Sequence, residues 1–334
     1  MRERHVPGLA LAVVRDGKVI KARGYGLANV ELNVPVTTET VFEIGSVTKQ
    51  ITAAAVLLLA GDGKLSLDDR INKHLPNLPD SWADITVRHL LTHTSGVRNY
   101  TGLGGFELSR RLKRDDFIKL LAAHPLNFRP GEQWSYGNSA YNLLGHVVES
   151  ASGQSYFEFV NARIFKPLGM NSTRDRDPRN VIPNRADGYE WEDGRLVGRD
   201  HDLTDVFSAG ALTSTVLDLA RWDAALHTDR LLKASTRAEM WTPVRLAGGQ
   251  SYPYGYGWNT LTWRGRRLVF HGGQTAGFAA SIQRFTDDRL TVIVLSNLGD
   301  IGLGSEIARR GRARRGWRAG RARRTRRRGA RRKR

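Results

Sequence analysis

The sequence has no cysteine, which excludes disulfides, thiolate metal sites and a cysteine nucleophile. It also has no apolar run near the ~18 residues needed to span a bilayer, so no membrane helix and no membrane contact are predicted. The first five residues, Met1 to His5, are mostly charged, and Pro7-Gly8 follows before any apolar stretch long enough for a secretory signal. We therefore expect a cytoplasmic protein, or a secreted or periplasmic one whose signal precedes this sequence.

What the chain does contain is enough apolar material for one large domain or two entwined ones: 334 residues, 40% of them hydrophobic. The net charge of +19 is misleading, because residues 309–334 hold 15 Arg and one Lys and no acid. Without them, 36 basic and 33 acidic residues leave a net charge of +3. The body is therefore an ordinary globular protein, and the basic end is a separate matter.

This basic tail, residues 307–334, consists almost entirely of Arg, Gly and Ala. It has too little apolar surface to fold, so we expect it to be disordered. One interpretation is salt-sensitive binding to nucleic acid or an acidic surface. The other is a non-native end, because a shifted reading frame in a GC-rich gene produces this mixture of residues. We favour the second interpretation.

The stretch 41–50 is the one around which the chain is organised, because an apolar extended run turns helical there just after Gly45. Ser46 and Lys49 stand three residues apart, on one face of the predicted helix. Residues 51–60 are apolar on every side, which predicts a buried helix. A lysine amine beside a serine hydroxyl can take its proton, and the first N–H groups of a helix can hold an oxyanion. The alternative is a capping serine and a lysine that reaches solvent.

A second stretch surrounds Tyr136 and Asn138. Pro130-Gly131 predicts a tight turn, and residues 140–150 have helical apolar spacing, with Asn138 or Ser139 as the expected cap. Tyr136 is then held on a fixed loop, where its phenol can carry protons, and a nearby ammonium would favour the phenolate. The alternative is a packed aromatic residue followed by a plain helix cap.

A third stretch is a strand that begins near Arg267 and runs through His271 into Gly272 and Gly273. Glycines here let a substrate lie along the backbone as an added strand. The backbone N–H of Gln274 is a candidate second oxyanion donor, opposite that of Ser46. The alternative is a turn with an incidental histidine.

The remaining sequence predicts mixed secondary structure. Asp16-Gly17 between two apolar runs predicts an N-terminal hairpin. His89 and His93 stand four apart but lack a third ligand at metalloprotease spacing, so core or surface positions are favoured over a metal site. The aromatic stretch 252–258 either lines a cleft or forms a kinked strand. Further predictions are helices at 84–91, 114–123, 155–165 and 216–226 (capped by Ser214 or Thr215), a hairpin at 279–296, and a polar loop at 171–206 with a strand pair around Gly194.

The three stretches together resemble the serine β-lactamase and penicillin-binding-protein superfamily. Ser-x-x-Lys at 46–49, Tyr-x-Asn at 136–138 and His-x-Gly at 271–273 each occur once, in the order of that family. The resemblance runs from about Pro7 to Asn297. The tyrosine form of the second motif is similar to class C β-lactamases, DD-peptidases, D-aminopeptidases and family VIII carboxylesterases. His271 in place of the usual lysine points to the esterase and peptidase side.

The resemblance implies an α+β fold, in which an antiparallel sheet built from the N-terminal hairpin and the C-terminal strands is flanked by helices. Residues 1–75 and 211–306 would form this sheet domain, 76–210 a mostly helical domain, and 307–334 the tail, with the site between the two domains. No metal and no cofactor are expected. The oligomeric state is left open.

The resemblance also implies roles. Ser46 would attack the substrate carbonyl, and Lys49 and Tyr136 would share the proton transfers, with the base left open between them. Asn138 would orient Lys49 or the substrate, and His271 would tune the proton of Tyr136 or hold the substrate beside Gly273 and Gln274. Carboxylic esters are the expected substrates. The alternatives are β-lactam or D-amino-acid peptide hydrolysis, and a non-catalytic penicillin-binding sensor.

Overall fold

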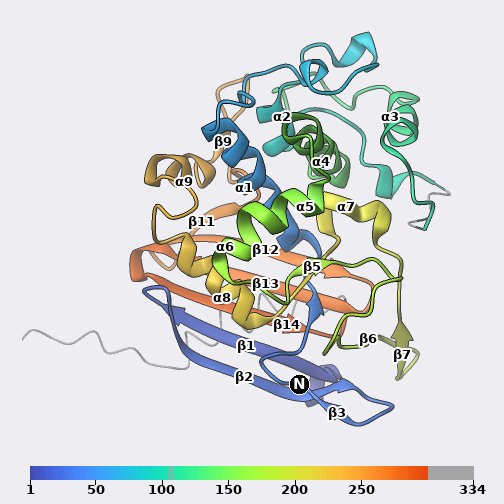
Figure 1. Ribbon diagram of the computed structural model, residues 1–334, viewed down its shortest axis with the longest axis vertical. Helices are drawn as coiled ribbons and strands as arrows, with labels where there is room; N and C mark the ends of the chain where they lie inside the picture. Colours follow the sequence, from blue (N-terminus) through green and yellow to red (C-terminus); the bar gives the residue numbers. More distant parts are fainter. Residues whose placement is uncertain (105–106, 108, 300–334) are drawn as a thin grey trace, which may run out of the picture.

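The computed structural model describes residues 1–104, 107 and 109–299, so the predicted tail at 307–334 lies outside the described residues. Its main element is a seven-stranded antiparallel sheet in the order β11-β12-β13-β14-β1-β2-β3 (Figure 1). The N-terminal hairpin lies beside the C-terminal strands because β1 pairs with β14, as predicted. The strands are β1 Gly8–Arg15, β2 Lys18–Asn29, β3 Val34–Pro35, β11 Asn259–Trp263, β12 Arg266–Thr275, β13 Phe278–Phe285 and β14 Leu290–Ser296.

The turns of the hairpins follow their sequence signals. Asp16 and Gly17 both have positive φ, 51° and 73°, which is the conformation that a two-residue turn between twisted strands requires. The predicted strand pair around Gly194 is present as β6 (Gly188–Glu192) and β7 (Arg195–Arg199). Three short strands form a separate small sheet, and two more form a pair: β4 Phe42–Glu43, β8 Leu212–Ser214 and β5 Arg174–Asp175, then β9 Val244–Arg245 and β10 Ser251–Tyr252.

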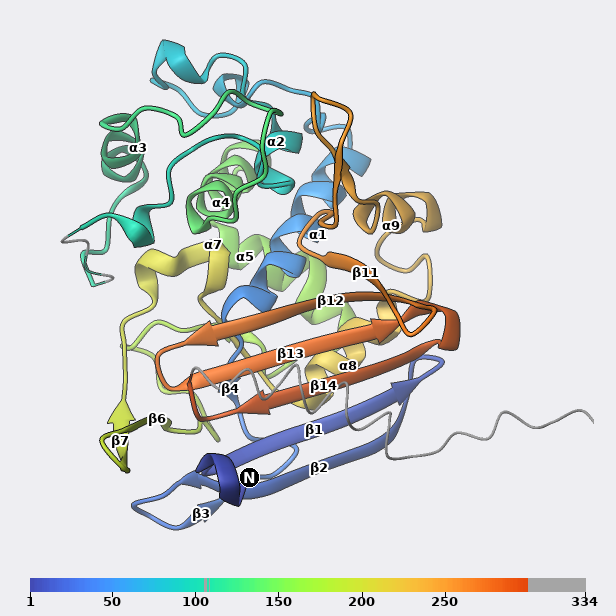
Figure 2. The same ribbon diagram turned by 180° about the vertical axis from the view of Figure 1, so that it is seen from behind.

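The helices occupy one face of the sheet and the region above it, as Figures 1 and 2 show. Helix α8 packs on β1, β2 and β14, whereas α1 runs from the sheet toward α4. None of the helices in the described residues is long and apolar enough to cross a membrane. They are α1 Thr48–Gly61, α2 Val87–Leu91, α3 Arg114–Ala122, α4 Asn138–Ser152, α5 Tyr156–Val160, α6 Lys166–Leu168, α7 Phe207–Gly210, α8 Val216–Ala225 and α9 Ala234–Met240.

Helix starts were predicted with mixed success. Thr215 caps α8 by accepting from the N–H of Asp218, as expected. The expected cap of α4 is wrong: the helix begins at Asn138 itself, and no side chain caps it. The hydroxyl of Ser139 instead donates to the carbonyl of Arg98, at 2.7 Å. The side chain of Asn138 is consequently available for another contact.

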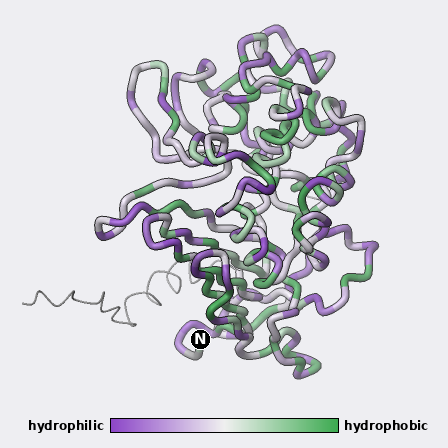
Figure 3. Tube along the Cα trace, turned by 60° about the vertical axis from the view of Figure 1, so that its left-hand side comes forward, coloured by the Kyte–Doolittle hydropathy of each residue, from purple (hydrophilic) through white to green (hydrophobic). Residues whose placement is uncertain are grey.

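One cluster of buried apolar side chains joins the sheet to the helices. Ile282 and Leu295 of the sheet belong to it together with Leu143 of α4 and Trp222 of α8. Figure 3 shows hydrophobic segments along the strands and central helices and hydrophilic loops at the periphery. The division into a sheet domain and a helical domain at 76–210 stays a prediction, and β5 pairs with β8 across its expected boundary.

Candidate active site

Ser46 and Lys49 lie where the sheet meets the buried helix. Ser46 is in the 3-10 turn Gly45–Val47, and Lys49 is in the first turn of α1. The Nζ atom of Lys49 is 3.1 Å from the Oγ atom of Ser46. The side chain of Lys49 is fully buried, so the alternative of a lysine that reaches solvent is wrong.

The amine of Lys49 is held by uncharged oxygens. Its Nζ atom donates to Oδ1 of Asn138, at 2.7 Å, and to the carbonyl of Ala209, at 2.8 Å. No ion pair forms at Lys49 in the described part of the chain, and burial lowers its pKa well below the usual 10.5. The site therefore keeps a desolvated amine against the serine hydroxyl, with one partner from α4 and one from α7.

Tyr136 lies beside this pair, and its surroundings favour the protonated phenol over the phenolate. The Nζ atom of Lys49 sits 4.8 Å from the centroid of the tyrosine ring, over its face. Burial raises the pKa of Tyr136, and a hydrogen bond with Ser46 lowers it by less. The residue as a whole is 37% exposed, but its hydroxyl lies beside Ser46. Burial of this end of the side chain has the largest effect on its pKa. The expectation that the ammonium would stabilise a phenolate is therefore wrong.

Strand β12 approaches the serine through its glycines. A Cβ atom at Gly273 would come within 1.9 Å of the carbonyl oxygen of Ile44 and 3.1 Å of the backbone N of Ser46. A Cβ atom at Gly45 would lie 2.6 Å from the backbone N of Gln274. The two backbone segments that carry the predicted oxyanion donors are thus in contact, and neither close approach tolerates a side chain.

The same part of β12 has a free edge. Its pairing with β11 ends at Phe270, opposite Asn259, whereas its pairing with β13 continues to Thr275. In the described residues, positions 271–275 of β12 are therefore paired along one edge only. An extended ligand can add there by β-augmentation, beside the turn that carries Ser46.

His271 is buried and uncharged near neutral pH. Burial lowers its pKa to about 3, and the charge of Lys49 acts in the same direction. Its Nδ1 atom lies 2.6 Å from the carbonyl of Gly272, and its Nε2 atom lies 3.1 Å from the hydroxyl of Tyr254. Its ring centroid is 6.0 Å from that of Tyr136, so the two residues meet ring to ring and the histidine nitrogens bond elsewhere.

Tyr254 links two histidines that sequence reasoning did not connect. Its hydroxyl is also 3.3 Å from Nε2 of His93, whose Nδ1 atom accepts from the N–H of Gly137. The carbonyl of Gly272 requires His271 to carry its proton on Nδ1, so Tyr254 donates to His271 and accepts from His93. Each group in this series thus donates to the next, from the backbone beside Tyr136 to strand β12.

His93 lies among the aromatic side chains beside Tyr136. It is buried, so of the two predicted positions, core or surface, the structure shows the core, and its ring centroid is 4.5 Å from that of Tyr136. The described residues contain no group of three side chains able to bind a metal ion. In the sequence, only the aromatic stretch 252–258 pointed to this cluster, because its residue Tyr254 bonds both histidines. Nearby, Trp134 and Tyr252 stack at 3.8 Å and extend the aromatic wall.

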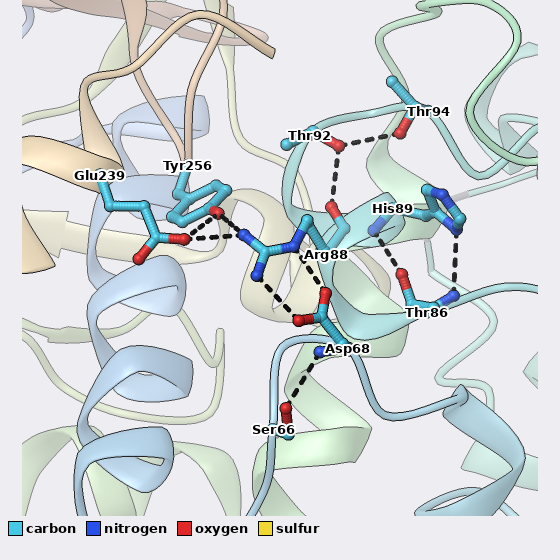
Figure 4. Close-up of polar contacts among 9 residues, drawn as sticks. All are labelled: Ser66, Asp68, Thr86, Arg88, His89, Thr92, Thr94, Glu239 and Tyr256. Carbon is cyan, nitrogen blue, oxygen red and sulfur yellow. Dashed lines mark hydrogen bonds and ion pairs between the residues drawn. The ribbon is translucent and has the colours of Figure 1, made fainter. Parts of the chain in front are cut away.

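A polar network anchors the segment that carries Tyr254. Figure 4 shows Arg88 of α2 between Asp68 on one side and Glu239 and Tyr256 on the other. Arg88 binds both carboxylate oxygens of Asp68, at 2.8 and 3.2 Å, and Oε1 of Glu239 at 2.7 Å. Tyr256 donates to the same oxygen of Glu239. This network fixes the backbone two residues after Tyr254 against the helical region.

Comparisons with known proteins place the chain in a family. Residues 1–313 match the family model described as Beta-lactamase. Penicillin-binding protein 4* of Bacillus subtilis is 31% identical over 88% of this chain and 69% of its own length. Proteins named flp from Staphylococcus aureus are 29% identical, and the chain spans only 61% of their length.

Solved structures share the fold. An octameric penicillin-binding protein homologue from Pyrococcus abyssi superposes with a TM-score of 0.81 and 31% identity, over 94% of this chain and 74% of that one. The D-amino acid amidase of Ochrobactrum anthropi SV3 does so with a TM-score of 0.80 and 25% identity, over 93% and 95%. The predicted α+β fold is confirmed, and this chain belongs to the β-lactamase family of serine hydrolases.

Proposed function

We propose that this family member cleaves carboxylic esters, and amides without a free carboxylate, through an acyl-enzyme formed on Ser46. The observation that carries the proposal is the amine of Lys49, buried without a counter-charge 3.1 Å from the serine hydroxyl. A lowered pKa makes the neutral form of Lys49 more populated at a given pH than in a solvated lysine, and a neutral amine accepts a proton.

The hydrogen bonds of Lys49 support the amine as the base. A neutral amine has two hydrogens and one lone pair. The carbonyl oxygens of Asn138 and Ala209 take the two hydrogens, at 2.7 and 2.8 Å. The lone pair is then left for the hydroxyl proton of Ser46, which is the direction of transfer that nucleophilic attack requires.

Tyr136 is better suited to donate a proton than to accept one. Its raised pKa keeps the phenol protonated, so we assign it the delivery of a proton to the leaving group. The oxygen of the tetrahedral intermediate would be held by the backbone N–H groups of Ser46 and Gln274. The ammonium of Lys49 then returns its proton to the phenolate of Tyr136, which restores both groups. Water attacks the acyl-enzyme, Lys49 takes the proton of that water and passes it to the departing oxygen of Ser46, and the carboxylic acid is released.

The charge of the site favours substrates without a carboxylate near the scissile bond. Residues 271–275 contain no cation, and the low pKa of His271 keeps that ring neutral. A penicillin or a peptide ending in D-alanine would therefore find no positive partner on this strand. Esters and amino-acid amides need none. The names of two solved relatives, D-amino acid amidase and D-stereospecific amidohydrolase, make D-amino-acid amides the second candidate substrates.

The decisive experiment compares wild-type protein with Ser46→Ala. We expect wild type to hydrolyse p-nitrophenyl esters and to be labelled by a fluorophosphonate, and Ser46→Ala to lose both properties. Turnover retained in Ser46→Ala would refute the proposal. D- and L-phenylalanine amides and nitrocefin assayed in parallel rank the substrate classes, and labelling by penicillin without turnover of any substrate would indicate a sensor instead.

A further inference from the structure

A cavity of about 290 Å³ lies far from Ser46, between the end of α8, helix α9 and the strands β12, β13 and β14. Arg267, near the start of β12, lines it, whereas the glycines that contact Ser46 lie toward the other end of that strand. The volume is at the lower limit of small-molecule pockets, which is ~300 Å³. This cavity therefore has the size of a ligand site and is separate from the proposed active site.

The lining of the cavity is basic. It includes four arginines and one histidine and no acidic residue: Arg237, Arg267, Arg284, Arg289 and His227. Apolar side chains complete one wall, namely Leu226, Ala234, Ala238 and Leu290. A cavity of this composition attracts an anion and can shelter an organic group beside it.

Carboxylates behind the cavity wall neutralise three of the four arginines. Arg237 pairs with Asp229 at 2.9 Å, Arg284 with Asp223 at 2.6 Å and Arg289 with Asp16 at 2.6 Å. Arg267 has no ion pair in the described residues, and its guanidinium donates only to the backbone carbonyl of Trp241, at 3.1 Å. One positive charge is therefore left without a partner.

Arg284 and Trp241 line the cavity, and each has an N–H group without an assigned hydrogen bond in the described residues. Arg284 is 3% exposed; its Nε atom binds Asp223, its Nη2 atom lies 2.9 Å from Nε2 of His227, and its guanidinium stacks over Trp241. Within the described part of the chain no hydrogen bond is assigned to its Nη1 atom. The indole Nε1 of Trp241 is buried and has no acceptor among the described residues. A ligand whose polar atoms only accept hydrogen bonds would satisfy both of these donors.

We propose that this cavity binds a small organic phosphate monoester. A phosphate oxyanion accepts at every oxygen, matches the fork of a guanidinium and balances the charge of Arg267. The organic group would lie against the apolar wall formed by α8 and α9. The binding does not depend on Ser46, so it can be tested separately from hydrolysis.

Isothermal titration with phenyl phosphate and with inorganic phosphate, at constant ionic strength set by NaCl, tests the proposal. We expect phenyl phosphate to bind the full chain in the micromolar to millimolar range, and more tightly than inorganic phosphate. Arg267→Gln should weaken binding at least about tenfold, because its guanidinium supplies the uncompensated charge. Arg264→Gln is the matched control: it removes the same charge three residues away, outside the cavity lining.

A second variant protects the test against a folding defect. Ala238→Glu places a carboxylate at an exposed position of α9 that lines the cavity, and it should abolish binding without lowering the melting temperature. Equal weakening by Arg267→Gln and Arg264→Gln would overturn the proposal, because it would show a general effect of charge. Absence of heat from both phosphates, or equal affinity for the two, would overturn it as well.

Discussion

Lys49 and Asn138 are joined by a 2.7 Å hydrogen bond that spans 89 residues of sequence. The partner is an uncharged amide, so the amine is positioned without being stabilised as an ammonium. A carboxylate in the same place would orient Lys49 equally well and would raise its pKa. An amide rather than an acid at this position is therefore compatible with the proposed role of Lys49 as the base.

Asn138→Asp tests this relationship directly. An aspartate at this position should raise the pKa of Lys49, because an opposite charge within hydrogen-bond distance favours the ammonium. The acidic limb of the pH profile of kcat/KM should therefore move to higher pH, with activity recovering toward alkaline pH. An unchanged acidic limb in a folded variant would argue against Lys49 as the base.

Tyr254→Phe removes the hydroxyl that joins His93 to His271. Two buried histidine nitrogens lose their partner, so we expect the free energy of unfolding to fall by about 1–3 kcal/mol. Loss of the anchor of His271 should also lower kcat/KM by about 10- to 100-fold through misplacement of Gly272 and Gly273. Tyr252→Phe is the control, because the hydroxyl of Tyr252 has no hydrogen bond in the described residues. Similar effects of the two variants would contradict the linking role.

His271→Gln tests the buried neutral histidine through stability. The pKa of His271 is about 3 in the folded chain, whereas a free histidine has ~6.5, so between these values the unfolded chain binds the extra proton. This histidine therefore destabilises the fold as pH falls below ~6.5, by about 1.4 kcal/mol per pH unit.

Denaturant unfolding of both proteins at pH 7 and pH 5 measures this effect. From the higher to the lower pH, wild type should lose about 2 kcal/mol more than His271→Gln. His201→Gln, at an exposed position, should follow wild type. Parallel losses in wild type and His271→Gln would mean that the ring is already charged or is solvated in the folded chain.

Gly273→Ala tests the contact between β12 and the serine turn. Its methyl group would fall 1.9 Å from the carbonyl of Ile44, so the strand must move away from Ser46. We expect destabilisation of about 1–3 kcal/mol and, because an oxyanion donor shifts, a loss in kcat of about 100-fold. Gly198→Ala in β7, which has open space at that position, should change neither. Full activity in Gly273→Ala would rule out the proposed oxyanion site.

Much of this fold is predictable from local signals. Asp16-Gly17 identifies the first hairpin, and the continuous apolar run after Ser46 identifies the buried helix. The strands β4, β5 and β8 are too short for any alternation to appear, so the small sheet is not legible in the sequence. The cap predicted for α4 is absent because the hydroxyl of Ser139 bonds a distant loop, a contact that no local pattern encodes.

Some parts of the candidate site are likewise predictable from the sequence, and others are not. Ser46, Lys49 and Tyr136 are predictable because spaced motifs mark them. The carbonyl of Ala209 is not, because any residue offers the same atom; its position depends on the backbone at Phe207, which adopts a positive φ of 43°. The phenolate expected at Tyr136 was wrong because sequence reveals the neighbouring amine but not the degree of burial.

The three partners of the Lys49 amine have one further consequence. Ser46, Asn138 and Ala209 are contributed by stretches scattered across more than 160 residues, and a nascent or partly unfolded chain has not yet brought them together. Such a chain carries an ordinary, solvated lysine and an unreactive serine. The contacts that the proposed mechanism requires of Lys49 thus form only with the completed tertiary structure.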